Sequence, residues 1–132
     1  YIAYTTNLSE DTEVFHNDIR GRFERGDKEV VEAMEFWAEL AQKARDLLKE
    51  KRDQDIGPLL NANFDRRRQV YNMSEGNIRM VETARSTGAT AKFTGSGGAI
   101  VGTYPDEETY EQLVQCLTPL GMKVIKPIIT QD

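Results

Sequence analysis

The glycine-rich segment Thr94-Gly95-Ser96-Gly97-Gly98 has the composition most suited to binding chemistry in this sequence. Glycine lacks a Cβ, so such a run can turn sharply and bring backbone N–H groups close to a ligand. Successive amides arranged in this way can hold an anion such as a phosphate. A tight hairpin turn between two strands is the competing interpretation, and the spacing alone favours it.

The residues that follow these glycines exclude two familiar phosphate-binding motifs. The run 99–104 is rich in β-branched and aromatic residues, so we expect a strand directly behind the glycines. The Walker P-loop and the dinucleotide-binding fingerprint both need a helix start at that place. The segment is therefore either a hairpin turn or an anion-holding loop of another kind.

A second candidate site lies in the polar stretch from Asn61 to Arg68. Asn63 and Arg67 are four positions apart, so they share one face of a predicted helix. The planar guanidinium group of arginine matches the geometry of a carboxylate or a phosphate. The competing interpretation is a solvated helix face on which Asp65 pairs with Arg67 or Arg68, and it is favoured on spacing alone.

The other reactive side chains are isolated from one another. His16 is the only histidine and has no cysteine or carboxylate companions at metal-ligand spacing. Cys116, the only cysteine, lies between Leu113 and Leu117 on a predicted apolar face, so we predict a buried and unreactive thiol. We therefore expect no metal site and no nucleophilic catalyst.

Length and composition limit the class of protein. The 132 residues suit one domain, residues 1–132, with a hydrophobic core. With 17 basic and 22 acidic residues the net charge is −5, which argues against a general nucleic-acid binder. No apolar run approaches the roughly 20 residues that a membrane-spanning helix needs. A single cysteine and the lack of a signal-peptide pattern lead us to expect a cytoplasmic protein.

Hydrophobic periodicity predicts an α+β fold. The expected order is a strand, four helices, two strands, a helix and a strand. The predicted strands are 1–6, 89–94, 99–104 and 122–129, and the predicted helices begin near residues 11, 28, 58, 75 and 107. If the first strand joins the later ones, the core is a ferredoxin-like split β-α-β-β-α-β sandwich with additional helices inserted after the first strand.

Three segments together resemble the C-terminal part of the GHMP sugar and metabolite kinases. The motif Lys-x-Thr-Gly-Ser-Gly-Gly-Ala at 92–99 is similar to the family's third motif. The similarity extends to Asn-Phe-Asp-x-Arg-Arg at 63–68 and to the helix end at 80–89, and glucuronokinase-like members are nearest in character. Ala99 departs from the pattern, because many members continue the glycine run there.

The resemblance implies roles for both candidate sites. The loop 94–98 would pack near the ATP phosphates and help to shape the active site. The helix bearing Asn63, Asp65 and Arg67 would face the cleft for the phosphoryl acceptor. If the acceptor is a sugar acid, the shape of the guanidinium group makes Arg66 or Arg67 our candidate for binding its carboxylate.

The resemblance also implies that the chemistry is divided. The family's nucleotide-binding Gly/Ser loop and N-terminal substrate motif have no match here, and its catalytic carboxylate and Mg²⁺ ligands belong to that same half. Because phosphoryl transfer depends on positioning and charge stabilisation, we expect no catalytic residue in this chain and no activity from it alone. We expect ATP and Mg²⁺ in the full-length enzyme, with no cofactor in this fragment. The expected partners are a sugar or sugar-acid substrate and the chain's own N-terminal kinase domain.

Two other classes of function stay open at this point. A free-standing α+β ligand-binding or regulatory module could use the glycine loop to hold an anion. A helix-rich interaction domain could expose an apolar face of the inserted helices. The sequence does not identify the acceptor sugar, the phosphorylated hydroxyl or the oligomeric state.

Overall fold

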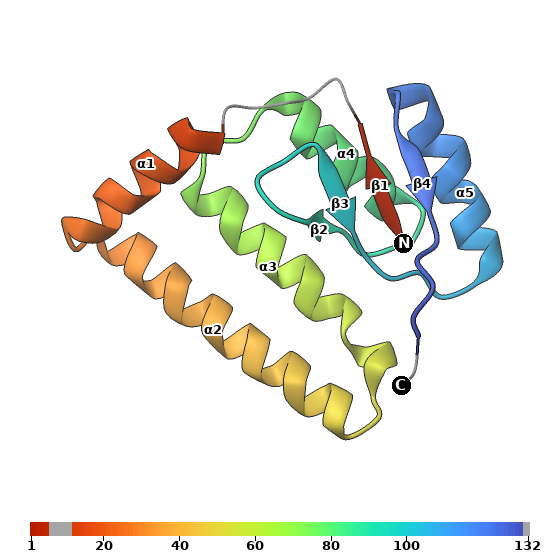
Figure 1. The fold of residues 1–132 in the computed structure, drawn as a ribbon, viewed down its shortest axis with the longest axis horizontal. Helices are drawn as coiled ribbons and strands as arrows, with labels where there is room; N and C mark the ends of the chain where they lie inside the picture. The colour runs from red at the N-terminus through yellow and green to blue at the C-terminus, as the bar shows by residue number, and fades with distance from the viewer. Residues whose placement is uncertain (6–11, 131–132) are drawn as a thin grey trace. The chain divides into compact units, whose positions relative to one another are not determined.

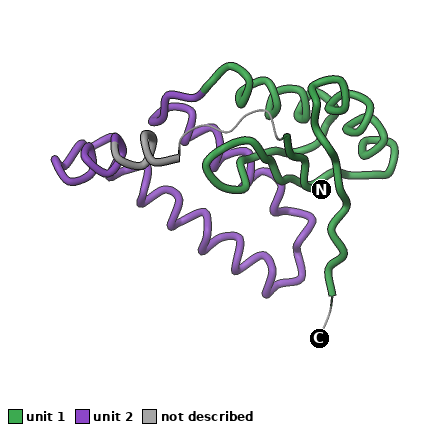
Figure 2. Tube along the Cα trace, turned by 45° about the horizontal axis from the view of Figure 1, so that its top comes forward, with its two compact units in different colours: residues 1–10, 74–132 green, residues 11–73 purple. Residues whose placement is uncertain are grey.

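A computed structural model describes residues 1–5 and 12–130, and the side chains of residues 12–17 lie outside its described part. The elements are β1 (Ile2–Tyr4), α1 (Thr12–Glu24), α2 (Lys28–Lys49), η1 (Asp53–Asp55), α3 (Gly57–Val70), α4 (Glu75–Ser86), β2 (Lys92–Phe93), β3 (Ala99–Val101), α5 (Glu107–Leu117), η2 (Thr118–Leu120) and β4 (Lys123–Ile125). The chain forms two compact units, coloured separately in Figure 2. Unit 1 comprises Tyr1–Glu10 and Ser74–Asp132, and unit 2 comprises Asp11–Met73.

Unit 1 contains a four-stranded sheet with the strand order β2-β3-β1-β4, in which every pair of neighbours is antiparallel. Its elements follow one another as β1-α4-β2-β3-α5-β4, which is the predicted β-α-β-β-α-β order. The helices α4 and α5 contact each other and lie on the same face of the sheet (Figure 1). The predicted α+β class, with helices inserted after the first strand, is confirmed.

The register of the sheet aligns one row of side chains toward the core of unit 1. Phe93 is opposite Ile100, Ile100 is opposite Ala3, and Ala3 is opposite Val124. Directly opposed residues point to the same face of a sheet, so this row forms one surface. Three of its members are buried, and the core is completed by buried residues of the two helices, namely Met80, Val81, Ala84, Leu113 and Leu117.

A close backbone approach lies at the end of this sheet. The Gly102 N–H donates a hydrogen bond to the Tyr1 carbonyl, and the Tyr1 hydroxyl donates one to the Thr90 carbonyl at 2.7 Å. A Cβ at position 102 would lie 1.8 Å from the Thr90 carbonyl oxygen. Only glycine fits there, because no other residue lacks that atom.

Unit 2 is helical, and α2 and α3 pack along each other (Figure 1). Its buried cluster consists of Ile19, Val30, Ala33 and Val70, with Trp37 and Tyr71 packed against it. Arg22 of α1 joins the three helices through its guanidinium group. It donates hydrogen bonds to Asp27, the N-cap residue of α2, and to the Val70 carbonyl at the end of α3, both at 2.8 Å. The bond between Arg22 and Asp27 raises the pKa of the arginine and lowers that of the aspartate.

Two apolar stripes with helical spacing run along α2, and only one of them is buried. The first consists of Val30, Met34, Trp37, Ala38, Ala41, Ala44 and Leu48, but Met34 and Leu48 are 36% and 57% exposed. The buried or half-buried stripe is Val30, Ala33, Trp37, Leu40, Ala44 and Leu47. Both stripes have helical spacing, so periodicity alone could not choose between the adjacent residues Ala33 and Met34.

Candidate functional site

The glycine segment, called the Gly loop from here on, comprises residues 94–98 and joins β2 to β3. These strands pair antiparallel, and the Thr94 N–H donates a hydrogen bond to the Ala99 carbonyl at 3.1 Å. The loop is therefore a hairpin connection, as its spacing predicts. Gly98 has a φ of 72°, a left-handed conformation that favours glycine.

Gly98 is held from two sides of unit 1. Its N–H donates a hydrogen bond to Oδ1 of Asn77 in α4, at 3.0 Å. Its carbonyl accepts a hydrogen bond from the Thr5 N–H, just after β1, at 2.9 Å. These two contacts tie the end of the Gly loop to a helix and to a neighbouring strand, so the shape of the loop depends on both.

Asn77 is a functional candidate that the sequence did not reveal. It lies in the first turn of α4, whose N-cap residue Ser74 accepts a hydrogen bond from the Asn77 N–H through Oγ at 3.3 Å. The Asn77 side chain is almost fully buried, and its Nδ2 finds no hydrogen-bond acceptor among the described residues. A Cβ at Gly97 would lie 3.0 Å from that nitrogen, so the loop passes very close to it.

The second candidate group lies on α3 in unit 2. Asn63 is half-buried, and its backbone carbonyl accepts a hydrogen bond from Nε1 of Trp37 at 3.2 Å. Arg67 is one helical turn further along and is also half-buried. Asp65 is exposed, because two positions along a helix turn its side chain to nearly the opposite side. The helix therefore groups Asn63 with Arg67 and sets Asp65 apart.

Two guanidinium groups on α3 stack on aromatic rings of unit 2. The Cζ atom of Arg66 lies 4.4 Å from the ring centre of Phe36 in α2. That of Arg67 lies 4.9 Å from the ring centre of Tyr71, which follows α3. Burial lowers the pKa of Arg67, although the nearby Tyr71 acts in the opposite direction. Arginine keeps its charge in proteins, so both rings hold an oriented cation.

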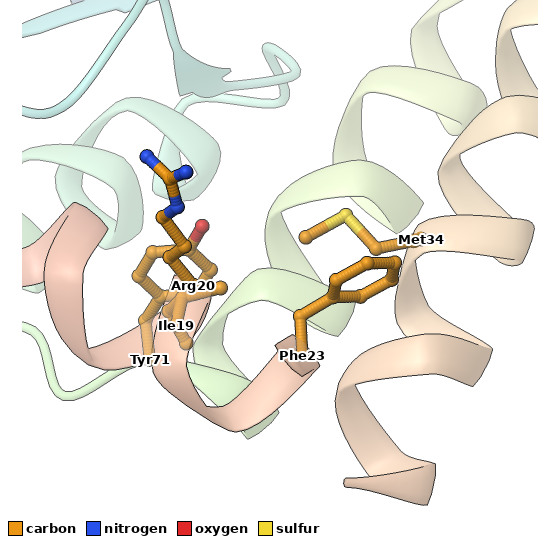
Figure 3. A pocket seen from close by; sticks show the side chains of 5 residues that line it. All are labelled: Ile19, Arg20, Phe23, Met34 and Tyr71. Atoms are coloured by element: carbon orange, nitrogen blue, oxygen red, sulfur yellow. The ribbon is translucent and has the colours of Figure 1, made fainter. Parts of the chain in front are cut away.

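Tyr71 also lines an apolar hollow of about 510 Å³ in unit 2. The other lining residues are Ile19, Arg20 and Phe23 of α1 and Met34 of α2. Figure 3 shows the Phe23 ring beside the Met34 thioether, with the Arg20 guanidinium extending away from them. The same tyrosine thus borders both this hollow and the Arg67 guanidinium.

The other predicted residues fall outside these groups. The side chain of His16 lies outside the described residues. The prediction of a buried Cys116 is wrong, because the cysteine is exposed while Leu113 and Leu117 of the same helix are buried. Within the described ranges, no group of three His, Cys, Asp or Glu residues is arranged to hold a metal ion. In the same part of the chain no helix has the length and apolar character to cross a membrane.

Comparison with protein families relates both candidate segments to one family. The model described as GHMP kinases C terminal matches residues 44–119. "Probable glucuronokinase 2" and "Glucuronokinase 1" of Arabidopsis thaliana are 37% and 36% identical to the chain over 118 residues. Each match covers 87% of this chain and 32% of the relative, so the chain spans about a third of the length of these relatives.

Solved structures with a similar fold include two mevalonate kinases. The L. major enzyme in complex with R-mevalonate matches 91% of this chain and 39% of its own chain, with a TM-score of 0.79 and 24% identity. The enzyme from methicillin-resistant Staphylococcus aureus MRSA252 matches 92% of this chain and 40% of its own, with a TM-score of 0.61 and 14% identity. At these identities the likeness concerns the fold.

Proposed function

The chain belongs to the GHMP kinase family and corresponds to the C-terminal domain of its members; on this basis we propose that it forms the acceptor-binding part of an ATP-dependent kinase for a sugar acid such as glucuronate. The observation that carries the proposal is the position of the family match. Residues 44–119 include both the Gly loop and the polar helix α3. The similarity to proteins named glucuronokinases favours a sugar acid among the possible acceptors.

The proposed reaction moves the γ-phosphoryl group of ATP onto a hydroxyl of the sugar acid. The bond between the γ-phosphorus and the bridging oxygen of ADP breaks, a bond to the sugar oxygen forms, and the hydroxyl proton is released. Catalysis of such a transfer comes mainly from positioning and charge stabilisation. The Gly loop, Thr94 to Gly98, would lie near the phosphates, and α3 would bind the acceptor.

Arg66 and Arg67 are the proposed partners of the acceptor carboxylate, with Asn63 on the same helix face for a sugar hydroxyl. Stacking on Phe36 and Tyr71 limits the freedom of both guanidinium groups before a ligand arrives. A group ordered in advance loses less entropy on binding, which favours affinity. Asp65 is exposed on another side of α3, so in this proposal it is less suitably placed to contact the acceptor than the two arginines are.

The residues present fit a phosphate better than a metal ion. The buried Nδ2 of Asn77 has no acceptor among the described residues, so in this proposal it is a donor for a phosphate oxygen once the glycine backbone beside it moves aside. The described residues do not fit Mg²⁺, because they offer no cluster of three potential ligands, and we assign no step of the reaction through the metal to them. In the proposed enzyme the N-terminal half supplies the metal ligands and the main ATP site.

The test is ADP formation by a protein that joins this chain to an N-terminal ATP-binding half. We expect kcat/KM for glucuronate to exceed that for glucose or neutral glucuronamide by about tenfold or more, because hydrogen bonds to charged groups are worth about 1.5–3 kcal/mol. Equal values for glucuronate and glucuronamide would exclude the carboxylate contact. No phosphoryl transfer to any sugar or sugar acid would overturn the proposed function.

A further inference from the structure

The side chain of Asn77 has a hydrogen-bond donor that the hairpin does not use. Its side chain is 1% exposed, and buried polar groups in proteins nearly always have partners. The bond from the Gly98 N–H fixes the orientation of the carboxamide, because only its oxygen can accept. The other terminal atom of the carboxamide is therefore Nδ2, and it has no hydrogen-bond acceptor among the described residues.

The unpartnered nitrogen is directed toward the Gly loop. The space that a Cβ of Gly97 would occupy lies only 3.0 Å from Nδ2. Asn77 also belongs to the first turn of α4, where free N–H groups and the helix dipole favour an anion. A glycine backbone, the start of a 12-residue helix and a buried spare donor thus meet at one place in unit 1.

We propose that Asn77 positions the Gly loop through Oδ1 and keeps Nδ2 as the donor for a phosphate oxygen of the bound nucleotide. The inference deepens the proposed kinase function and rests on it. Without a ligand, the bond to Gly98 fixes the end of the loop. When a phosphate arrives, the Gly97 segment moves aside and Nδ2 gains its acceptor.

Asn77→Asp separates the two roles of the side chain. An aspartate keeps an oxygen for the Gly98 N–H but has no donor and adds negative charge facing the phosphate. In the joined protein, we expect protection of the Gly98 amide from hydrogen exchange to persist, while the Kd for ATP measured by calorimetry at about pH 7.5 rises about tenfold or more. Gln112→Glu is the matched control, since it adds the same charge at an exposed position of α5 and should leave the ATP Kd unchanged.

Asn77→Leu removes both roles at similar side-chain volume. We expect the Gly98 amide to exchange about tenfold faster or more, and ATP to bind more weakly. If this variant does not fold, the unaltered protein still provides a test, because saturating ATP should shift the NMR resonance of the Asn77 side-chain amide.

Three outcomes would overturn the inference. The first is an Asn77→Asp variant that binds ATP as well as the unaltered protein does. The second is an Asn77 side-chain amide resonance that ATP leaves in place. The third is a folded Asn77→Leu variant with unchanged exchange at Gly98. Failure of the sugar-acid assay alone would refute the proposed acceptor but not the proposed role of Asn77, because the readouts for Asn77 concern ATP binding and the loop rather than turnover.

Discussion

The guanidinium of Arg67 lies 4.9 Å from the ring centre of Tyr71, so the cation of the second candidate site is held against an aromatic face. The ring belongs to the residue that follows α3, only four positions further along the chain. This short separation makes the pair a local property of the end of the helix. The contact explains how one polar helix can present an oriented cation without the help of residues distant in the sequence.

Arg67→Ala in the proposed enzyme should raise the KM for the acceptor by about 10- to 100-fold, because a charge-assisted hydrogen bond to the carboxylate is lost. The KM for ATP should change little. Arg68→Ala is the matched control, since Arg68 is the next residue of α3 and is exposed. Steady-state kinetics with each substrate varied in turn would measure both values. An unchanged acceptor KM in the Arg67 variant would contradict the assignment.

Gly102→Ala should destabilise unit 1 by about 3 kcal/mol or more, because overpacking against backbone cannot be relieved by a rotamer change. The new Cβ would meet the Thr90 carbonyl oxygen at 1.8 Å. Gly95→Ala is the control, since no atom lies within 4 Å of the position that a Cβ would take there. Urea denaturation followed by circular dichroism would compare them. Equal midpoints for the two variants would show that the approach at Gly102 is not tight in solution.

Asp106 should make the stability of unit 1 depend on pH in the acidic range. Its carboxylate caps α5 and accepts hydrogen bonds from the N–H and the hydroxyl of Thr109 at 2.8 and 2.7 Å, which lower its pKa. A carboxyl group whose pKa is lower in the folded state stabilises the fold above its unfolded pKa, about 3.9. That contribution is lost as the pH falls through the folded value.

Asp106→Asn keeps a capping oxygen that does not titrate. The free energy of unfolding of the unaltered chain should therefore fall relative to that of this variant as the pH drops below about 4. Glu111→Gln, at an exposed position of the same helix, controls for the general effect of removing a carboxylate. A difference between Asp106→Asn and the unaltered chain that stays constant from about pH 6 to about pH 2 would contradict the assigned bonds.

The order and type of the elements could be predicted because they are local properties of the sequence. Apolar residues at helical spacing and β-branched runs bounded by glycine and proline identified the five α-helices and the strands of the sheet among the described residues. The Gly loop and the polar face of α3 could also be predicted. The residues of the loop are contiguous in the sequence, and those of the helix face are one turn apart. The pairing of Arg67 with Tyr71 is equally short in range, because the two residues are only four positions apart.

The details that depend on tertiary packing could not be predicted. Ala33 is buried and Met34 is exposed, although both fit an apolar stripe that starts at Val30. Cys116 is exposed beside the buried Leu117, because the stripe of α5 is narrower than the run of apolar residues. The bond from Gly98 to Asn77 joins residues 21 positions apart, and only the folded unit brings them together.

The most direct test of the central claim is ATP-dependent phosphorylation of glucuronate, measured for this chain alone and for the chain joined to an N-terminal ATP-binding half. The division of labour proposed for the GHMP kinase fold predicts no turnover by the chain alone and clear turnover by the joined protein. Turnover by the chain alone, or none by a folded joined protein that binds ATP, would contradict it.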